Sequence, residues 1–165
     1  MKRYIKSAIV PLSEEPYDFR VDLATYSTTD PRTLDRLADE NDEIIRDMVA
    51  SNKNTSPETL AKLATSVDLS VRCCVGDNPN TPVATLEMLT EDESSDVRAN
   101  VAKNVNCPKY ILRKLANDTS WKPKYAVAEN PSTSNDILEY LTNDSDPAIS
   151  KTAKYRLGWI KHLWE

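Results

Sequence analysis

Between residues 55 and 78 the chain reads TSPETLAKLATSVDLSVRCCVGDN, which contains the signals for two short helices joined by a break. Pro57 is tolerated in the first turn of a helix, and Thr55 offers a hydroxyl cap with Glu58 at the distance of a capping box. The apolar residues then recur at helical spacing as Leu60, Leu63 and Ala64. The sequence therefore predicts a helix that begins near Pro57 and buries one face.

A second helix follows the break at residues 66–68. Asp68 can cap it, and its inward stripe is Val71, Cys74, Val75 and Asn78. Asn78 is expected to end it, because asparagine accepts the left-handed conformation common at helix C-termini, and Pro79 prevents continuation. A ladder of buried asparagine amides that hydrogen-bond the next repeat is compatible with the same pattern.

Both halves of this unit recur every 26 residues. In the first helix, the leucine positions repeat as Leu34, Leu60, Leu86, Leu112 and Leu138 and as Leu37, Leu63, Leu89, Leu115 and Leu141. In the second helix, the valine and asparagine positions repeat as Val49, Val75, Val101 and Val127 and as Asn52, Asn78, Asn104 and Asn130. A fixed period of this length is the signature of a solenoid, in which each repeat contacts only its neighbours.

The period also predicts how the chain is organised. We expect an all-α, right-handed α-solenoid of about five two-helix repeats, forming a single repeat domain over residues 1–165. Residues 1–28 are expected to form an N-terminal arm, at residues 4–10, and a half-repeat cap with its helix at residues 16–26. Residues 29–145 are expected to hold the helical repeats, and residues 146–165 a C-terminal cap helix that is longer than the other helices.

The composition narrows the classes of function. The formal net charge of −5 disfavours nucleic acid as a partner, because wide contact with a phosphate backbone needs clustered Lys and Arg. The two glycines, Gly76 and Gly158, cannot build a Gly-rich phosphate loop. No apolar run approaches the roughly 20 residues of a membrane span, and the N-terminus lacks the apolar core of a secretory signal. With three cysteines, an odd number, we expect a cytoplasmic protein without disulfides.

The segment Val71-Arg72-x-x-Val75-Gly76-x-Asn78-Pro79-x-Thr81-Pro82 and its copy Val97-Arg98-x-x-Val101-Ala102-x-Asn104 resemble the leucine-rich repeat variant family. The resemblance covers residues 16–156 and implies paired helices stacked into a right-handed superhelix that serves as a binding scaffold. Two features depart from the family. The repeat is slightly longer, so both helices are expected to be α where the family often has one 3₁₀ helix. Some relatives carry a preceding iron-sulfur module, but no cysteine precedes residue 73 here. The resemblance therefore implies the fold and no cofactor.

Cations occupy one position of the second helix in every repeat. They are Arg20, Arg46, Arg72, Arg98 and Lys124. A ladder of cations can bind phosphates or other anions. Carboxylates are also close in sequence: Asp42 and Asp68 start the helices of Arg46 and Arg72, and Asp92 and Asp96 precede Arg98. Because such pairs between neighbouring repeats can hold the stack in register, we favour a structural ladder and keep anion binding as the alternative.

A solenoid recognises partners through side chains that differ from repeat to repeat. Opposite the apolar stripe of the second helix, one position reads Glu43, Leu69, Ser95 and Trp121, and another reads Asp47, Cys73, Ala99 and Tyr125. Trp121 and Tyr125 share a helical face, and aromatic residues are enriched in interface hot spots. We predict that Leu69, Cys73, Trp121 and Tyr125 line part of a protein-binding surface. Packing of Trp121 against a neighbouring helix is the alternative.

The sequence offers no catalytic, metal or cofactor site. The soft metal ligands are Cys73, Cys74, Cys107 and His162, of which Cys74 falls in the core stripe and Cys107 in the position of Thr55 and Thr81. No recognised spacing places a nucleophile beside the histidine. We therefore expect a non-catalytic scaffold that binds another protein. The alternatives are a small acidic inhibitor, phage or mobile-element encoded, that blocks a nucleic-acid-binding host protein, and a HEAT-like DNA-binding protein or DNA glycosylase, which the acidic charge disfavours.

Overall fold

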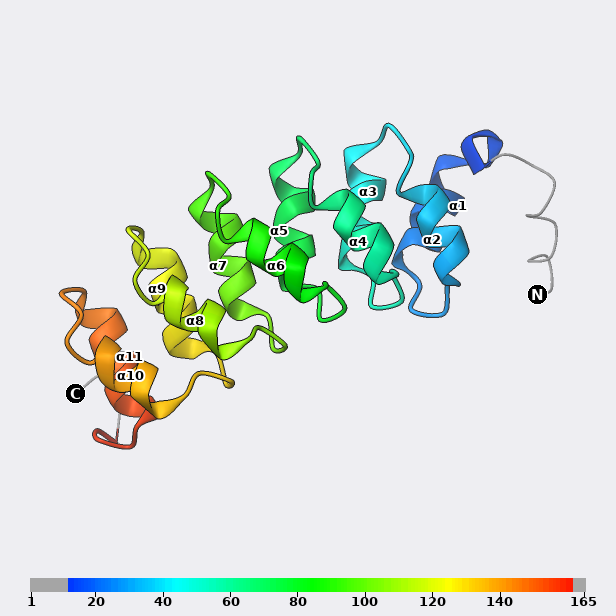
Figure 1. Cartoon of the computed structure of the whole chain (residues 1–165). Coiled ribbons are helices and arrows are strands. Elements are labelled where there is room, and N and C mark those ends of the chain that lie inside the picture. The colour runs from blue at the N-terminus through cyan, green and yellow to red at the C-terminus, as the bar shows by residue number, and fades with distance from the viewer. Residues whose placement is uncertain (1–11, 162–165) are drawn as a thin grey trace.

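The computed structural model describes residues 12–161, and every regular element within them is a helix (Figure 1). A short 3₁₀ helix, Leu12–Glu14, precedes the α-helices. The odd-numbered helices are α1 (Tyr17–Thr25), α3 (Glu43–Ser51), α5 (Leu69–Asp77), α7 (Ser95–Lys103), α9 (Trp121–Glu129) and α11 (Pro147–Arg156). The even-numbered helices are shorter: α2 (Pro31–Leu37), α4 (Pro57–Leu63), α6 (Val83–Leu89), α8 (Lys109–Leu115) and α10 (Asn135–Leu141). The arm predicted at residues 4–10 lies outside the described residues.

The helices form two layers, an odd layer and an even layer. α1 stands alone, and five pairs follow it, from α2–α3 to α10–α11. Each odd helix packs against the next odd helix, and each even helix packs against the odd helices before and after it. In Figure 1 the even layer lies in front of the odd layer, and the stack bends along its length. The predicted all-α solenoid of five pairs preceded by a half-repeat is confirmed, and both helices of each pair are α-helices.

Leucine and valine side chains fill the space between the two layers. The even helices contribute both leucine positions of the period, and the odd helices contribute branched residues such as Val71, Val75, Val97 and Val101, all at most 3% exposed. Burying one such side chain contributes roughly 1.5–3 kcal/mol. Because each repeat contacts only its neighbours, the core is a continuous strip along the stack, and every repeat must keep the same apolar positions.

Neighbouring odd helices approach closely because one position on them is always small. That position holds Ala24, Ala50, Gly76, Ala102 and Ala128, all buried. At Gly76, a methyl group would lie 3.1 Å from the backbone nitrogen of Val101 on α7, which is tighter than an ordinary contact. Gly76 therefore lets the backbones of α5 and α7 lie almost in contact.

The sequence suggested that the asparagines at the ends of the odd helices adopt the left-handed conformation, and this prediction is wrong. Asn78 has φ −67° and ψ 125°, and no described residue except Gly158 has a positive φ. Its side chain instead bonds the preceding repeat. Asn78 Nδ2 donates to the carbonyl oxygens of Ala50, at 2.7 Å, and Asn52, at 3.0 Å, at the end of the preceding odd helix. The alternative interpretation, a buried amide ladder, is therefore the correct one, and it reaches back to the previous repeat.

The same arrangement recurs at every asparagine of the period. Asn104, 1% exposed, donates to Gly76 O at 3.0 Å and Asn78 O at 2.7 Å, and its Oδ1 accepts from the Asn106 backbone N–H at 2.9 Å. Equivalent bonds are made by Asn52, Asn78 and Asn130. In the last pair this position holds Arg156, whose Nη1 donates to the carbonyls of Ala128, Glu129 and Asn130. Each side chain thus satisfies carbonyls that the preceding helix end leaves unpaired.

The sequence suggested that Thr55 caps α4, but it does not. Ser56 is the N-cap residue, and its Oγ accepts from the Thr59 N–H at 3.1 Å. The Thr55 hydroxyl instead donates to the Val49 carbonyl at the end of α3. Thr81 and Thr133 repeat this bond at 2.6 Å. The threonines therefore fasten the turns after α3, α5 and α9, and Cys107 occupies the same position after α7.

The last helix is shorter than predicted. α11 ends at Arg156, and the predicted helix to residue 165 is wrong for residues 157–161, while residues 162–165 lie outside the described part. Gly158 has φ 73°, its N–H donates to Tyr155 O at 2.9 Å, and the Trp159 N–H donates to Lys154 O at 2.9 Å. These two bonds form a Schellman motif, which ends a helix at a left-handed glycine.

Replacing one ladder asparagine is predicted to destabilise the whole chain. Asn104→Ala leaves the Gly76 carbonyl without its side-chain donor and weakens the pairing of the Asn78 carbonyl, so we expect a loss of about 2–4 kcal/mol in the free energy of unfolding. Urea denaturation followed by circular dichroism measures it. Asn143→Ala is the control, since Asn143 is exposed and its side chain donates only one long bond, of 3.5 Å, to Glu139 O. Equal losses of stability from the two substitutions would contradict a stabilising role for the asparagine amide ladder.

Cys107→Thr is predicted to stabilise the protein. The new hydroxyl would donate to the Val101 carbonyl as Thr81 does to Val75, with a gain of about 0.5–1.5 kcal/mol. Cys107→Val is the matched control, because valine has the shape of threonine without the donor. A thermal melt of the three proteins tests this, and the expectation fails if valine stabilises as much as threonine.

Candidate functional site

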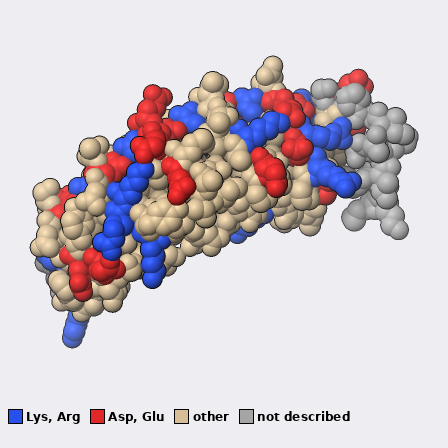
Figure 2. Space-filling view, viewed as in Figure 1, with Lys and Arg blue, Asp and Glu red and all other residues tan. Residues whose placement is uncertain are grey.

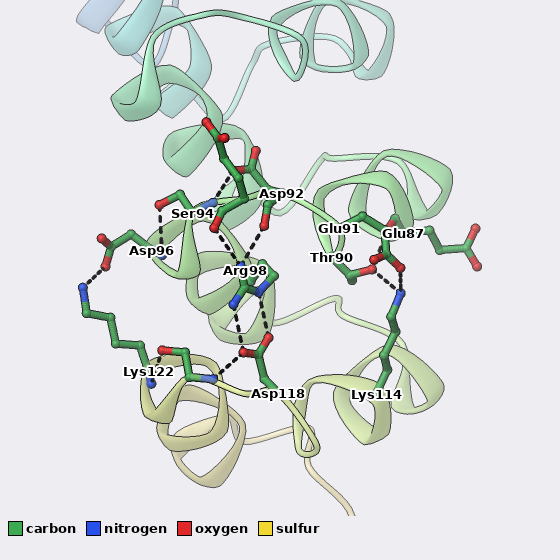
Figure 3. Close-up of polar contacts among 12 residues, drawn as sticks. Glu87, Thr90, Glu91, Asp92, Ser94, Asp96, Arg98, Lys114, Asp118 and Lys122 are labelled. Atoms are coloured by element: carbon green, nitrogen blue, oxygen red, sulfur yellow. Dashed lines mark hydrogen bonds and ion pairs between the residues drawn. The ribbon is translucent and has the colours of Figure 1, made fainter.

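The five ladder cations lie on the odd helices, and each is paired with a carboxylate of the next repeat. Arg98 on α7 bonds Asp118 at both oxygens, with Nε–Oδ2 2.7 Å and Nη2–Oδ1 2.9 Å. Its Nη1 donates to the carbonyls of Asp92, at 2.7 Å, and Glu93, at 3.1 Å (Figure 3). Arg72 repeats the whole arrangement one step earlier, on Asp92, Ser66 and Val67.

The remaining ladder positions follow the same rule. Arg46 bonds Asp68 at 2.5 Å, Lys124 bonds Asp144 at 2.7 Å, and Arg20 pairs with Glu40. Asp42 and Asp68 start the helices of Arg46 and Arg72, and the pairing that the sequence favoured runs between neighbouring repeats. Asp68 pairs with Arg46 of the preceding repeat, while Asp42 accepts from the Ile45 N–H as the N-cap of α3. The long arginine side chain of Arg46 reaches forward to a carboxylate in the loop that precedes the next odd helix.

Burial and pairing act in opposite directions on the ladder carboxylates. Burial alone would raise the pKa of Asp118, but the hydrogen bonds from Arg98 and from the Ser120 N–H outweigh it, and the pKa of Asp118 is lowered from its ordinary value. The pKa of Asp92 is lowered in the same way, against burial, by Arg72 and the Ser94 N–H. The hydrogen bonds that Arg98 donates to Asp118 raise the pKa of Arg98 in turn. Both partners therefore stay charged near neutral pH.

The hollow beside this ladder is lined by cations that already have partners. It has a volume of 360 Å³ and lies between the loops that follow α6 and α8. Its cations, Arg98 and Lys114, bond Asp118 and Glu91, and Lys114 Nζ also donates to Thr90 Oγ1 at 2.7 Å (Figure 3). An anion that entered here would have to displace a carboxylate.

The four residues predicted to bind a partner occupy equivalent positions on two helices. Leu69 and Cys73 lie on α5, and Trp121 and Tyr125 lie on α9, with α7 packed between the two helices. The Trp121 side chain is 56% exposed, and its ring meets the Tyr125 ring edge-on, with centroids 6.4 Å apart and an angle of 65°. Leu69 is 45% exposed, while Cys73 and Tyr125 are half-buried. The geometry thus brings each pair together on its helix and leaves Trp121 open to solvent.

The cysteines are placed for packing. Burial raises the pKa of the Cys107 thiol to about 12 and that of Cys74 to about 11, so neither is a reactive thiolate near neutral pH. Cys74 Sγ donates to Asp47 Oδ1 at 3.1 Å. Burial also raises the pKa of Cys73, which lines a hollow of 210 Å³ with Cys74, Asn78 and Asn100. Within residues 12–161 no group of three or more His, Cys, Asp or Glu could hold a metal ion, and no helix is long and apolar enough to cross a membrane.

Two exposed tyrosines on the even layer form contacts that the sequence did not predict. Tyr110 Oη donates to Glu87 at 2.5 Å, and Tyr140 Oη donates to Asn117 at 2.6 Å, each across to the preceding pair. The signal that could have located them is the separation of 23 residues, which also joins the ion pairs Lys62–Asp39, Lys114–Glu91 and Arg113–Asp136. Side chains at this separation link each even helix to the neighbouring even helix or to the turn that follows it, so the exposed tyrosines have structural partners.

Comparison with solved structures agrees with this architecture. A structure described as a leucine-rich repeat variant with a novel repetitive protein structural motif superposes on the chain with a TM-score of 0.66 at 23% identity. The match covers 88% of this chain and 57% of that chain, so this chain spans little more than half of the other's length. No protein-family model and no curated protein matches the sequence. The predicted resemblance is confirmed in the fold, which is similar to that of a leucine-rich repeat variant.

The buried ladder pairs are predicted to matter more for stability than the exposed pairs. Arg98→Met leaves Asp118, whose side chain is 8% exposed, without its partner, and we expect a loss of about 1–3 kcal/mol in the free energy of unfolding at pH 7. Arg113→Met is the matched control, because its pair with Asp136 is more than half exposed and is expected to contribute less than about 0.5 kcal/mol.

The pH dependence of this difference has a definite sign. Since pairing lowers the pKa of Asp118 in the folded chain, its contribution is complete above the unfolded-state value of about 4 and is lost as the pH falls through the lower, folded value. Urea midpoints measured from pH 7 down to about pH 3 should show wild type and Arg98→Met converging. A difference that stays constant or grows as the pH falls would contradict the assigned pairing.

Proposed function

We propose that the chain is a non-catalytic scaffold that binds another protein through the outward side of the odd layer, around Trp121. The observation that carries this proposal is the exposure of Trp121, at 56%, on a helix whose other face is fully used in stacking. Large aromatic side chains in such positions are typical interface anchors. The edge-on contact with Tyr125 holds the indole ring in place, so less conformational entropy is lost when a partner binds.

The repeat separates residues with structural duties from residues without them. The leucines, valines and small residues fill the core, the asparagines and threonines bond backbone carbonyls, and the ladder cations bond carboxylates. Leu69 and Trp121 occupy one position of the period that also holds Glu43 and Ser95, so no common structural role fixes their identity. Such variable positions give solenoids their partner specificity, which supports this face as the binding surface.

We assign the ladder Arg20, Arg46, Arg72, Arg98 and Lys124 to stacking, with anion binding as the less favoured alternative. Every one of the five pairs with a carboxylate of the following repeat, and this leaves none of them as a free cation for phosphate. Together with the net charge of −5, these pairs favour a protein over a nucleic acid as partner.

The proposal is tested by affinity capture from the native host with wild type, Trp121→Ala and Tyr140→Ala. Tyr140 is the matched control, since it is 53% exposed but lies on the even layer. We expect proteins captured by wild type to be lost with Trp121→Ala and kept with Tyr140→Ala, while the unfolding transitions of all three stay alike. Capture that is undiminished with Trp121→Ala would refute this surface.

A second candidate is the acidic inhibitor of a nucleic-acid-binding protein. It is favoured by five carboxylates on α1, α3 and α5 that form no ion pair with another described residue: Asp18, Asp22, Glu43, Asp47 and Asp77. If this function holds, double-stranded DNA should compete with the chain for the captured protein. A captured protein that binds DNA and this chain at the same time rules this candidate out for that partner.

A further inference from the structure

The unpaired charges of the odd layer are separated along the stack. Its N-terminal half, on α1, α3 and α5, carries the five carboxylates named above, and none of them forms an ion pair with another described residue. Glu43 accepts from Ser70 Oγ at 3.0 Å and Asp47 from the Cys74 thiol at 3.1 Å, bonds that orient the carboxylates but leave their charge. The three arginines on these helices are all paired within the ladder. This half is therefore negative.

The C-terminal half of the odd layer has the opposite sign. Lys103, Lys151 and Lys154 form no ion pair within the described residues, and Arg156 bonds only backbone carbonyls there. A single unpaired carboxylate on α9 and α11, Glu129, opposes them. The other cations of α9 are already neutralised, Lys122 by Asp96 and Lys124 by Asp144.

An apolar section lies between the two charged halves. Leu69 and Cys73 on α5 and Trp121 and Tyr125 on α9 flank α7, which presents only the small residues Ser95 and Ala99 at the equivalent positions. With neighbouring helices about 8–10 Å apart, the two apolar pairs are about 16–20 Å from each other. The outward side of the odd layer thus reads negative, apolar, positive from α1 to α11.

The even layer shows no such order. Its opposite charges alternate and pair across neighbouring helices, as in Lys62–Asp39 and Arg113–Asp136. Figure 2, which views the molecule from the same side as Figure 1, shows basic and acidic side chains interspersed over this face. The charge separation therefore belongs to the face that carries Trp121.

We propose that the odd layer binds a segment of a partner protein in one fixed direction, with the segment's basic end over α1–α5, apolar side chains against Leu69 and Trp121, and its acidic end over α11. Opposite charges at both ends favour this direction, and the reversed direction places like charges together. From α3 to α11 the segment crosses about 32–40 Å, which an extended chain covers in about 10–12 residues. This inference rests on the proposed protein-binding function and adds the chemistry of the partner.

The test is selection of binders from a displayed random library of peptides of about 16 residues, longer than the predicted span, against the full chain. We expect enriched peptides with Lys or Arg at one end, apolar residues in the middle and Asp or Glu at the other end. The strongest peptide, synthesised with a fluorophore, is then titrated against Glu43→Lys/Asp47→Lys. Affinity should fall about tenfold or more and be restored by a peptide whose basic end is changed to Glu. Glu58→Lys/Glu139→Lys, on the exposed even layer, should leave the affinity unchanged.

The outcomes separate this inference from the proposed function. If peptides bind, lose affinity with Trp121→Ala and are indifferent to Glu43→Lys/Asp47→Lys, the surface is correct and the fixed direction is wrong. If the charge reversal abolishes binding but Trp121→Ala does not, the direction stands and the aromatic anchor is wrong. Two results would refute binding of a partner segment. The first is that no peptide is enriched, and the second is a concentration-dependent dimer, seen by sedimentation, that the charge reversal dissociates. In the second case the occupant is another copy of this chain.

Discussion

The stack depends on how the backbone carbonyls at the end of each odd helix find hydrogen-bond donors. These carbonyls are buried by the following repeat, so water cannot serve them, and an unpaired buried carbonyl costs about 1–3 kcal/mol. Asn78 and Asn104 solve this with one amide each, which bonds two carbonyls of the preceding helix end and fixes its own turn through Oδ1. The amide therefore joins repeats and shapes the loop at the same time.

The other regular features become intelligible around this bond. The amide reaches the preceding carbonyls because neighbouring odd helices lie close together, and they can do so because Ala50, Gly76 and Ala102 keep the contact position small. The Arg98–Asp118 pair joins the next repeat from another point of the same helix. Two kinds of polar link thus act on each interface, one reaching backward and one forward, while leucine and valine supply the apolar area. Arg156 shows that the requirement is for a donor and not for asparagine, because it serves three carbonyls in the last pair.

Much of this was predictable from sequence, and the exceptions share a cause. The period predicted the helix pairs, the buried leucines and the cation ladder, because apolar and charged positions are fixed by helical geometry. Three predictions were wrong: the left-handed conformation of Asn78, the Thr55 cap and the long last helix. They relied on local propensity at positions where the conformation is determined by contacts with another repeat or by a single glycine. Gly158 was a readable stop signal, because a lone glycine near a helix end favours a Schellman motif. The ladder partners of Arg72 and Arg98 lie 20 residues ahead, at Asp92 and Asp118, a separation that only the packed repeats define.

The partner-binding residues remain a prediction of a different kind. Leu69, Cys73, Trp121 and Tyr125 were chosen because the period locates them without dictating them, and the structure places them on one side of the odd layer. What the sequence could not give is the order of charges around them, because it becomes clear which carboxylates and cations are left over only after the ladder pairs are known. Structural pairing in the ladder therefore determines which charges remain on the outward side of the odd layer.

Native-state hydrogen exchange of Asn104→Ala, followed by mass spectrometry of peptides from each helix, tests most directly whether the amide ladder couples the repeats. If it does, wild-type α5, α7 and α9 exchange together as one cooperative unit, and the substitution separates exchange on the two sides of the α5–α7 interface. A variant in which these helices still exchange together at wild-type rates would contradict this account, since the interface would then be held by the apolar strip and the arginine pairs alone.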